Sequence, residues 1–444
     1  MPVADEGGDD MAENVIPMHS FKRGGKGFKA NELEIGRLLR EHPELGMGKM
    51  FREDTFTGQT LMLMPIPRPW APQAKRKFEV HEAGSNDITR LIEWLIAHGA
   101  LKGEVSQSKV NNAIQLLADD NQFSSAQAAL DRLPAWDGVY RLDGFFTKVC
   151  NAVVAEEGMS EEEIFNRQRY LTALARCFFI SIVARILRPG CKVDTVIILE
   201  GPQGSLKSTL LKILAFDGKW FSDSMQSDLS NKDAKLHLLG KMIVELAEIS
   251  QLKTTGVEKL KAFLSASEDT YRKPYGRGEA TYLRQCIFVG TTNHDDYLID
   301  ETGNRRFWPV KCGRIDIELA REWRDQLFAE AIDAFSKREQ WWLSRDIETL
   351  AEDEQQQRMV EDVWEQKAID LIHEARSNPF KGGSWVTIKE LLDAVMPNSD
   401  NREERLQKRA GRVLRKHRGS KRQLPRGRKP EGWPLRGFHW EPYQ

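Results

Sequence analysis

The sequence predicts an α/β fold flanked by a mostly helical N-terminal domain and a basic C-terminal domain. The apolar segment 196–199 runs into a glycine-bearing loop and then a Leu/Ile/Lys helical pattern, the strand–loop–helix order of a phosphate-binding loop. Two more apolar segments, 241–250 and 286–290, carry polar side chains at or near their ends, where open α/β sheets place ligands. Amphipathic helical patterns precede this region, and a cation-rich one follows it.

Composition sets the class of protein. The chain has 444 residues, 40% of them hydrophobic, and a net charge of −1, so we expect two to four domains and only local surfaces for a polyanion. Its five cysteines are far apart and include no C-x-x-C pair, which favours reduced thiols. The apolar run 171–187 is interrupted by Arg176 and Arg185, as in a buried core helix. We expect a cytoplasmic protein with no membrane partner.

The N-terminal part divides into a lead-in and an accessory domain. Residues 1–28 are acidic and then rich in glycine and lysine, which predicts disorder, and residues 29–135 read as a mostly helical domain without a catalytic group. The expected elements are a helix from Asn31, a strand pair at 50–56 and 59–65, a helix capped by Asp87 and a helix after Ser108.

The loop after the first apolar strand follows G-x-x-x-x-G-K-[ST] with one departure, because Leu206 replaces the second glycine. A leucine there must hold a conformation that glycine adopts more easily, and Gly204 partly restores the freedom of the loop. We expect Lys207 near the outer phosphates and Ser208 on Mg²⁺; the alternative is an ordinary turn. The predicted ATP-binding residues are Gly201, Pro202, Gln203, Gly204, Ser205, Leu206, Lys207, Ser208 and Thr209.

The next two strands supply the groups that hydrolysis would need. Glu245 and Glu248 lie in KMIVELAEIS, and we assign Glu245 to the Mg²⁺ shell and Glu248 to the catalytic acid. They share a face only if the strand ends or bends between them, and two solvated glutamates are the alternative. Asn293 follows the later strand, where it could bond the γ-phosphate or its attacking water.

Two groups of cations follow the acids. Arg305 and Arg306 lie before an apolar strand, where an arginine supplied in trans could stabilise transition-state charge; a surface ion pair is the alternative. The segment 269–284 interleaves arginines and lysines with tyrosines, which suits single-stranded DNA, although a solvated loop would look similar. The cations predicted to contact DNA there are Arg272, Lys273 and Arg277, beside Arg284.

The C-terminal region, residues 346–444, has the pattern of a winged helix. Thr387 and Glu390 form a capping-box signature, and a basic helix and a pair of aromatic-rich strands follow. A basic third helix of this kind would enter the major groove of duplex DNA; a solvated basic face is the alternative. The predicted contacts are Lys408, Arg409, Arg412, Arg415 and Lys416.

Taken together, RPGCKVDTVIILEGPQGSLKST, GKMIVELAE, DTYRKPYGR, FVGTTN and GNRRFWPV resemble the virulence-associated protein E family over about residues 136–312. The resemblance implies an AAA+-like P-loop ATPase domain, here 136–345, related to superfamily 3 helicases. It would make Lys207 and Ser208 Walker A residues, Glu245 and Glu248 Walker B residues, and Asn293 the sensor. Arg305 or Arg306 would be the arginine finger, and Lys273 and Arg277 would lie in the ring pore.

These observations lead us to expect an ATP- and Mg²⁺-dependent, helicase-like ATPase that replicates phage or mobile-element DNA in a bacterial cell. It would act as a homo-oligomeric ring, a hexamer, with single-stranded DNA in the pore and duplex at the C-terminal domain. No cluster of acids before residue 136 indicates a primase, so a separate primase or other replication protein would be a partner. The alternatives are an ATP-regulated, origin-binding initiator without motor activity and a small-molecule kinase.

Overall fold

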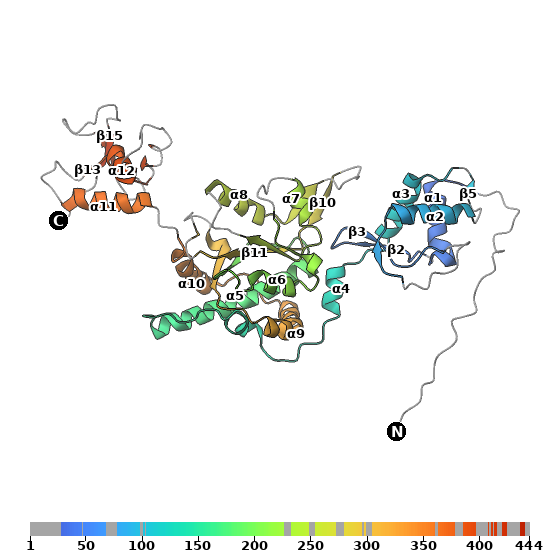
Figure 1. Cartoon of the computed structure of the whole chain (residues 1–444), viewed down its shortest axis with the longest axis horizontal. Coiled ribbons are helices and arrows are strands. Elements are labelled where there is room, and N and C mark those ends of the chain that lie inside the picture. Colours follow the sequence, from blue (N-terminus) through green and yellow to red (C-terminus); the bar gives the residue numbers. More distant parts are fainter. Residues whose placement is uncertain are drawn as a thin grey trace, which may run out of the picture. The chain divides into compact units, whose positions relative to one another are not determined.

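The structure is a computed structural model of the 444-residue chain (Figure 1). It describes residues 28–46, 48–67, 78–97, 101–102, 104–225, 232–247, 254–271, 279–294, 297–298, 304–359, 363–377, 385–396, 407, 410–411, 413–414, 420–423 and 436–439. The chain divides into two compact units. The first takes residues 1–249, 255–293 and 305–351, and the second takes 250–254, 294–304 and 352–444.

A five-stranded, wholly parallel sheet lies at the centre of the first unit, in the order β12-β6-β11-β8-β7. Every residue of β6 and β11 is buried, which explains why both strands read as continuous apolar runs. The expected α/β class is therefore confirmed for this part of the chain. The strands are β6 (Val196–Glu200), β7 (Phe221–Ser222), β8 (Ile243–Ala247), β11 (Ile287–Thr292) and β12 (Phe307–Lys311).

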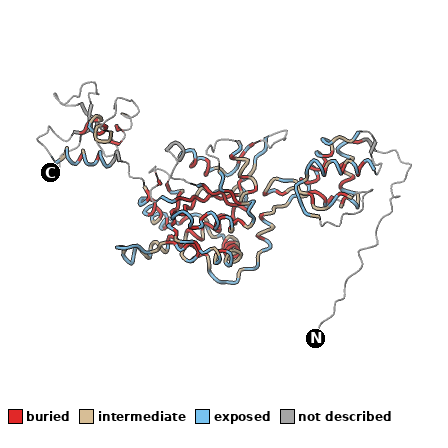
Figure 2. Tube along the Cα trace, viewed as in Figure 1, coloured by how far each residue is buried: buried red, intermediate tan, exposed pale blue. Residues whose placement is uncertain are grey.

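Helices cover both faces of this sheet. One face shares a core with α5 (Glu161–Leu187), α6 (Lys207–Leu214) and α9 (Ile317–Ser336). The red stretches at the centre of Figure 2 mark buried residues of this part of the chain. On the other face, Phe263 of α8 (Thr254–Leu264) packs edge-on against Phe288 of β11 at 5.5 Å. The smaller elements between them are η2 (Leu142–Gly144), the π-helix η3 (Phe145–Val149), η4 (Gly218–Trp220), α7 (Lys232–His237) and η6 (Asn304–Arg306).

The sequence predicted α5 as a buried core helix, and the structure confirms it. A capping box of Ser160 and Glu163 begins the helix. Among the described helices it alone is long and apolar enough to cross a membrane, but 78% of its most apolar window is buried inside the protein. Arg176 and Arg185, which interrupt the run, find internal partners: Arg176 bonds Glu339, Asp143 and Glu330, and Arg185 donates to backbone carbonyls.

The N-terminal residues of this unit form a module with its own core around Leu39, Phe51, Trp94 and Ile114. Three strands form an antiparallel sheet in the order β2-β3-β4, where the sequence predicted a pair. The elements are β1 (Phe28–Lys29), α1 (Glu32–Glu41), η1 (Pro43–Leu45), β2 (Phe51–Asp54), β3 (Gln59–Met62), β4 (His81–Glu82), α2 (Ser85–Ala97), β5 (Leu101–Lys102), α3 (Gln107–Asp119) and α4 (Ser125–Asp131).

Two helix starts in this module differ from the predictions. The helix that Asp87 was expected to cap begins earlier, at Ser85, and the Asp87 carboxylate instead reaches back from the first turn to the Gly84 N–H at 3.0 Å. The next helix begins at Gln107, because Ser106 rather than Ser108 supplies the capping oxygen, to the N–H of Lys109.

The second unit holds a smaller core of Ile372, Leu391, Leu392 and Leu414 with their neighbours. The predicted capping box of Thr387 and Glu390 is confirmed. Helical residues at 410–411 and 413–414 and an antiparallel sheet in the order β13-β15-β14 suit a winged helix, which stays a prediction. The elements are α10 (Arg345–Gln356), which spans the boundary between the units, α11 (Val363–Ser377), β13 (Trp385–Val386), α12 (Ile388–Val395), β14 (Ser420–Gln423) and β15 (Arg436–His439).

Candidate nucleotide site

The loop between β6 and α6 has the backbone of an anion cradle. Gly201 and Gly204 have φ of 145° and 83°, and a Cβ on Gly201 would lie 2.9 Å from the Cys312 carbonyl oxygen. Leu206 has φ 70° and ψ 24°, which confirms that this leucine holds a left-handed conformation that glycine adopts more easily. Leu206 is the N-cap residue of α6, and its side chain makes no capping hydrogen bond to the first turn of that helix. Because backbone N–H groups point toward the N-terminal end of an α-helix, those of the first turn of α6 face the loop, as an anion site requires.

Lys207 lies inside this loop with 8% of its surface exposed. Its Nζ donates to the carbonyls of Gly201 at 2.7 Å and Pro202 at 3.1 Å, to Ser205 Oγ at 3.1 Å and to Asn293 Oδ1 at 3.2 Å. An ammonium has three N–H donors for these four acceptors, so the contacts are shared. Burial lowers the pKa of Lys207, and the acidic groups of Cys312 and Glu245 oppose that shift. Phosphate oxygens would give the ammonium stronger acceptors than these neutral ones.

Glu245 lies on β8 beside β11 and is 2% exposed. Its Oε1 accepts from Ser208 Oγ at 2.8 Å and from Thr291 Oγ1 at 2.6 Å. Its Oε2 is buried and has no hydrogen-bond partner among the described residues. A buried carboxylate oxygen without a donor is unfavourable unless a cation or water satisfies it, and carboxylate and hydroxyl oxygens are the ligands Mg²⁺ prefers. Ser208 and Glu245 therefore fit the predicted metal site.

Thr291 was not predicted as a site residue. The sequence signal was present in FVGTTN, where the two threonines directly precede Asn293 at the strand end. Register decides its role, because Thr291 pairs with Ala247 and so lies beside the end of β8. Its hydroxyl fixes one oxygen of Glu245, which leaves the other oxygen for a ligand.

The structure places three of the six predicted catalytic residues, Lys207, Glu245 and Asn293, at the carboxyl edge of the sheet. Lys207 is hydrogen-bonded to Asn293, and Ser208 to Glu245. Glu248 lies outside the described residues.

The two arginines before β12 have different surroundings. Arg306 turns inward: its Nη2 donates to Ser265 Oγ at 3.2 Å, and its Nε lies 3.6 Å from Asp194 Oδ2. Arg305 is exposed, and its carbonyl accepts from the Trp308 indole at 3.1 Å. An arginine that serves a neighbouring subunit must have a free head group, so Arg305 is the better candidate.

The basic segment between the acids and Asn293 begins and ends in a hairpin of β9 (Glu268–Tyr271) and β10 (Ala280–Leu283). The rings of Tyr271 and Tyr282 stack at 4.7 Å across it. Arg284 corrects an expectation. It is 3% exposed and forms a bidentate ion pair with Asp269, at 2.6 and 2.9 Å, so it is not a DNA-facing cation. Arg272, Lys273 and Arg277 lie outside the described residues, as do Lys408, Arg409, Arg412, Arg415 and Lys416.

The cysteines agree with the expectation of reduced thiols. All five are free. Among the residues that the structure describes, no three or more His, Cys, Asp or Glu side chains gather as a ready-made metal site. A metal at the loop would therefore depend on Ser208, Glu245 and the nucleotide itself.

Comparison with known proteins adds a family and a set of similar structures. The family model described as the virulence-associated protein E-like domain matches residues 130–360, more than half of the chain. Among curated proteins, none matches the sequence. Two apo structures of the C-terminal region of NrS-1 (305–718) are similar, at 14% identity and TM-score 0.46 and at 12% and 0.47. Each alignment covers 92% of this chain and 99% of that one.

Proposed function

Because this chain belongs to the virulence-associated protein E-like family, we propose that it is a Mg²⁺-dependent ATPase that acts on DNA during replication of a phage or mobile element. The proposed assembly is a homo-oligomeric ring, a hexamer, with helicase-like activity. Its relation to superfamily 3 helicases and its AAA+ character belong to the same proposal.

One observation carries the ATPase proposal. The lysine that begins α6 bonds an asparagine just after β11, and the serine that follows the lysine bonds a buried glutamate of β8 with a spare oxygen. They come from three parallel neighbouring strands or their following residues, at the edge where such sheets place ligands. Phosphoryl transfer needs this set: a cation on the phosphates, an oxygen ligand for the metal and a polar group near the γ-phosphate.

The chain's own groups have separate tasks in this scheme. Lys207 would exchange its contacts with loop oxygens for phosphate oxygens, which frees the Asn293 side chain to reach the γ-phosphate or its attacking water. Glu245 Oε2 and Ser208 Oγ would hold Mg²⁺, and Mg²⁺ would neutralise charge that develops on the β- and γ-phosphates. Glu248 is the proposed acid that orients the water.

In this proposal, each nucleotide site is completed by an arginine from the adjacent subunit, and this arrangement requires a ring of subunits. Arg305 is exposed in the isolated chain and would reach the nucleotide of the adjacent subunit, whereas Arg306 would hold the chain segment in place through Ser265 and Asp194. The basic segment between β9 and β10 would contact single-stranded DNA, and the C-terminal cations would contact duplex. A separate primase remains a proposed partner.

The test is steady-state ATP hydrolysis with and without single-stranded DNA. Wild-type protein should be stimulated by DNA, and Lys207→Ala should lower turnover at least about 100-fold. Lys212→Ala is the matched control, because Lys212 is an exposed lysine of the same helix. Arg305→Ala should also inactivate the ring, and mixing Arg305→Ala with Lys207→Ala subunits should restore part of the turnover, because some interfaces then pair an intact lysine with an intact arginine.

A second candidate is an ATP-regulated initiator that binds a replication origin without motor activity. The left-handed Leu206 favours it, since a strained loop could bind nucleotide and turn it over slowly. Wild-type protein that binds duplex DNA but hydrolyses no ATP would establish this candidate and end the motor proposal. ATP hydrolysis that no DNA stimulates would instead favour a kinase-like enzyme.

A further inference from the structure

The turn between β2 and β3, residues 54–57, is held in its conformation by hydrogen bonds to the Asp54 carboxylate. Asp54 is 2% exposed, and its Oδ1 accepts from the N–H groups of Phe56 at 3.1 Å and Ser125 at 2.9 Å. Its Oδ2 accepts from the hydroxyls of Thr57 at 2.8 Å and Ser125 at 2.7 Å. Four donors thus hold one buried carboxylate, which fixes the turn with Phe56 at its tip. We call residues 54–57 the docking turn.

The tip of the docking turn is buried in the core of the parallel sheet's unit rather than in the core of its own module. Phe56 is 1% exposed, belongs to the large hydrophobic cluster around the sheet, and meets Trp220 edge-on at 5.2 Å. Its carbonyl accepts from the Gly240 N–H at 3.0 Å. Gly240 has φ 71°, and a Cβ there would lie 3.3 Å from Thr57 Cα and Cγ2, so a side chain would be both strained and crowded.

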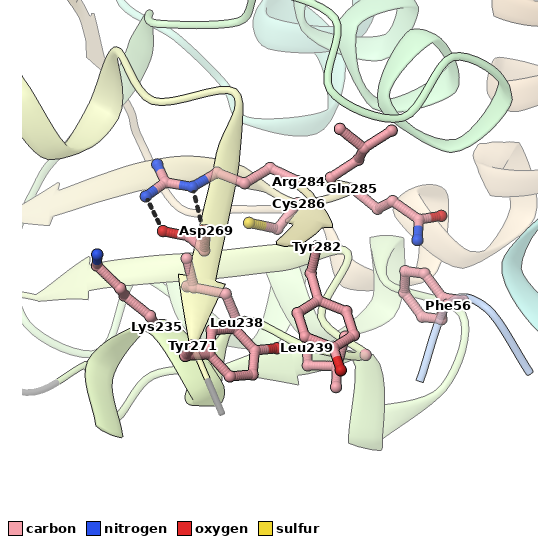
Figure 3. A pocket seen from close by; sticks show the side chains of 12 residues that line it. Phe56, Lys235, Leu238, Leu239, Asp269, Tyr271, Tyr282, Arg284, Gln285 and Cys286 are labelled. Carbon is pink, nitrogen blue, oxygen red and sulfur yellow. Dashed lines mark hydrogen bonds and ion pairs between the residues drawn. The ribbon is translucent and has the colours of Figure 1, made fainter. Parts of the chain in front are cut away.

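A second contact reaches the base of the β9–β10 hairpin. Gln285 Nε2 donates to the Thr55 carbonyl at 3.1 Å. Gln285 lies between β10, which leads back to the basic segment, and β11, which leads to Thr291 and Asn293. Figure 3 shows the open pocket here, with Phe56 at one side and the hairpin base, Asp269 with Arg284, at the other.

The hairpin base is itself fixed on its inner side. Arg284 pairs with Asp269, donates to the Phe263 carbonyl and lies over the Phe263 ring at 4.4 Å. The Arg284 carbonyl accepts from the N–H of Gly190 at 2.9 Å. The docking turn therefore adds a further contact to this base, through Gln285.

From these contacts we infer that the docking turn is a positioning element for the β9–β10 hairpin, and that the N-terminal module thereby sets how DNA at the hairpin affects ATP hydrolysis. The inference rests on the proposed function. Its physical basis is that the turn contacts both segments, at Gly240 and at Gln285, that directly precede the strands carrying Glu245 and Thr291. A change at the hairpin base can therefore reach both strands through these contacts.

The experiment uses the full chain with Gln285→Ala and Phe56→Leu, which keep most of the buried volume. Amide hydrogen exchange should become about fivefold faster in β9, β10 and residues 285–286, as expected for loss of one hydrogen bond, while α5 stays unchanged. DNA stimulation of ATP hydrolysis should fall several-fold, with the rate without DNA kept within about twofold. The control is Gln59→Ala, which removes an exposed bond to Glu82 at 3.0 Å in the same small sheet.

Two outcomes would overturn the inference. If exchange quickens equally in α5 and in the hairpin, Phe56 and Gln285 serve only general stability. If exchange and DNA stimulation both match wild type, the docking turn positions nothing. Failure of the proposed function is separate: a wild-type protein without ATPase activity would end that proposal, while the exchange measurement would still decide whether the docking turn holds the hairpin base.

Discussion

Two buried glutamates in the first unit have nearly equal exposed fractions but differ in how many of their carboxylate oxygens have a partner. Glu330 of α9 is 1% exposed, and Glu245 of β8 is 2% exposed. Glu330 Oε2 accepts from the N–H groups of Arg141 at 2.7 Å and Leu142 at 3.0 Å, and its Oε1 faces Arg176 at 3.3 Å. Glu245 uses only Oε1, and its Oε2 has no hydrogen-bond partner within the described ranges.

The difference separates a structural carboxylate from one arranged for a ligand. Around Glu330, burial raises the pKa, while the two N–H groups and the charge of Arg176 lower it, and all its oxygens have partners. This group ties α9 to α5 and to residues 141–142. The surroundings of Glu245 and Lys207 are less complete. One carboxylate oxygen has no partner among the described residues, the lysine shares its three donors among four acceptors, and Leu206 keeps a left-handed backbone. Unmet bonding capacity marks the site that a ligand would complete.

The largest effect should come from the structural glutamate. Glu330→Ala leaves two N–H groups without their acceptor and removes one of the three carboxylates around Arg176, so the free energy of unfolding should fall by about 3–5 kcal/mol. Denaturant unfolding followed by tryptophan fluorescence measures it. Turnover per folded molecule should stay within about twofold of wild type. Glu318→Ala is the control, because Glu318 lies on the same helix with its side chain 90% exposed. A loss under about 1 kcal/mol would contradict the comparison.

Glu245→Gln should show the reverse pattern. The amide oxygen can still accept from Ser208 and Thr291, and the buried charge is gone, so the free energy of unfolding should change by less than about 1 kcal/mol. ATP turnover should fall about 10²–10³-fold, because the carboxylate ligand of Mg²⁺ is lost. Parallel unfolding and ATPase assays separate the two effects. A stability loss as large as that of Glu330→Ala would mean that Glu245 is structural too.

Thr291→Val tests how Glu245 is oriented. The substitution removes one donor to Oε1 at nearly constant volume, so the Mg²⁺ concentration for half-maximal nucleotide binding should rise about tenfold. A fluorescent ATP analogue titrated at several Mg²⁺ concentrations reports this without hydrolysis. Thr291→Ser keeps the hydroxyl and should restore the wild-type value. If serine and valine behave alike, the hydroxyl plays no part in placing the carboxylate.

Leu206→Gly should have the smallest effect. Glycine relieves the left-handed strain but gains freedom in the unfolded chain, so the net change in unfolding free energy should be a stabilisation of at most about 1 kcal/mol. The turnover number distinguishes the two candidate functions. A rise would show that the leucine slows hydrolysis, as the initiator candidate requires, whereas an unchanged rate would show that the loop already works with leucine.

Local signals in the sequence predicted much of the fold and part of the site. The strand–loop–helix at 196–214, the buried helix over 171–187 and the capping box at Thr387 were predictable, because each depends on periodicity or on hydrogen bonds between residues three or four apart. The helix starts predicted at Asp87 and Ser108 were wrong by a few residues, because neighbouring polar residues there can also cap the helix.

Composition also misplaced Arg284, which it grouped with the DNA-facing cations. Its carboxylate partner, Asp269, lies 15 residues earlier, across a hairpin whose pairing only the folded chain shows. A charged side chain in a basic segment gives no sign of its own burial.

By itself, the sequence determined the family, the phosphate-binding loop and the identity of Lys207, Ser208, Glu245 and Asn293 as candidates. Only the tertiary structure placed Thr291 on Glu245 across 46 residues of chain, distinguished the exposed Arg305 from the inward Arg306, and buried Phe56 beside Trp220. The reason is physical. Local patterns fix what each segment forms, whereas strand register and the packing of distant segments fix which side chains meet.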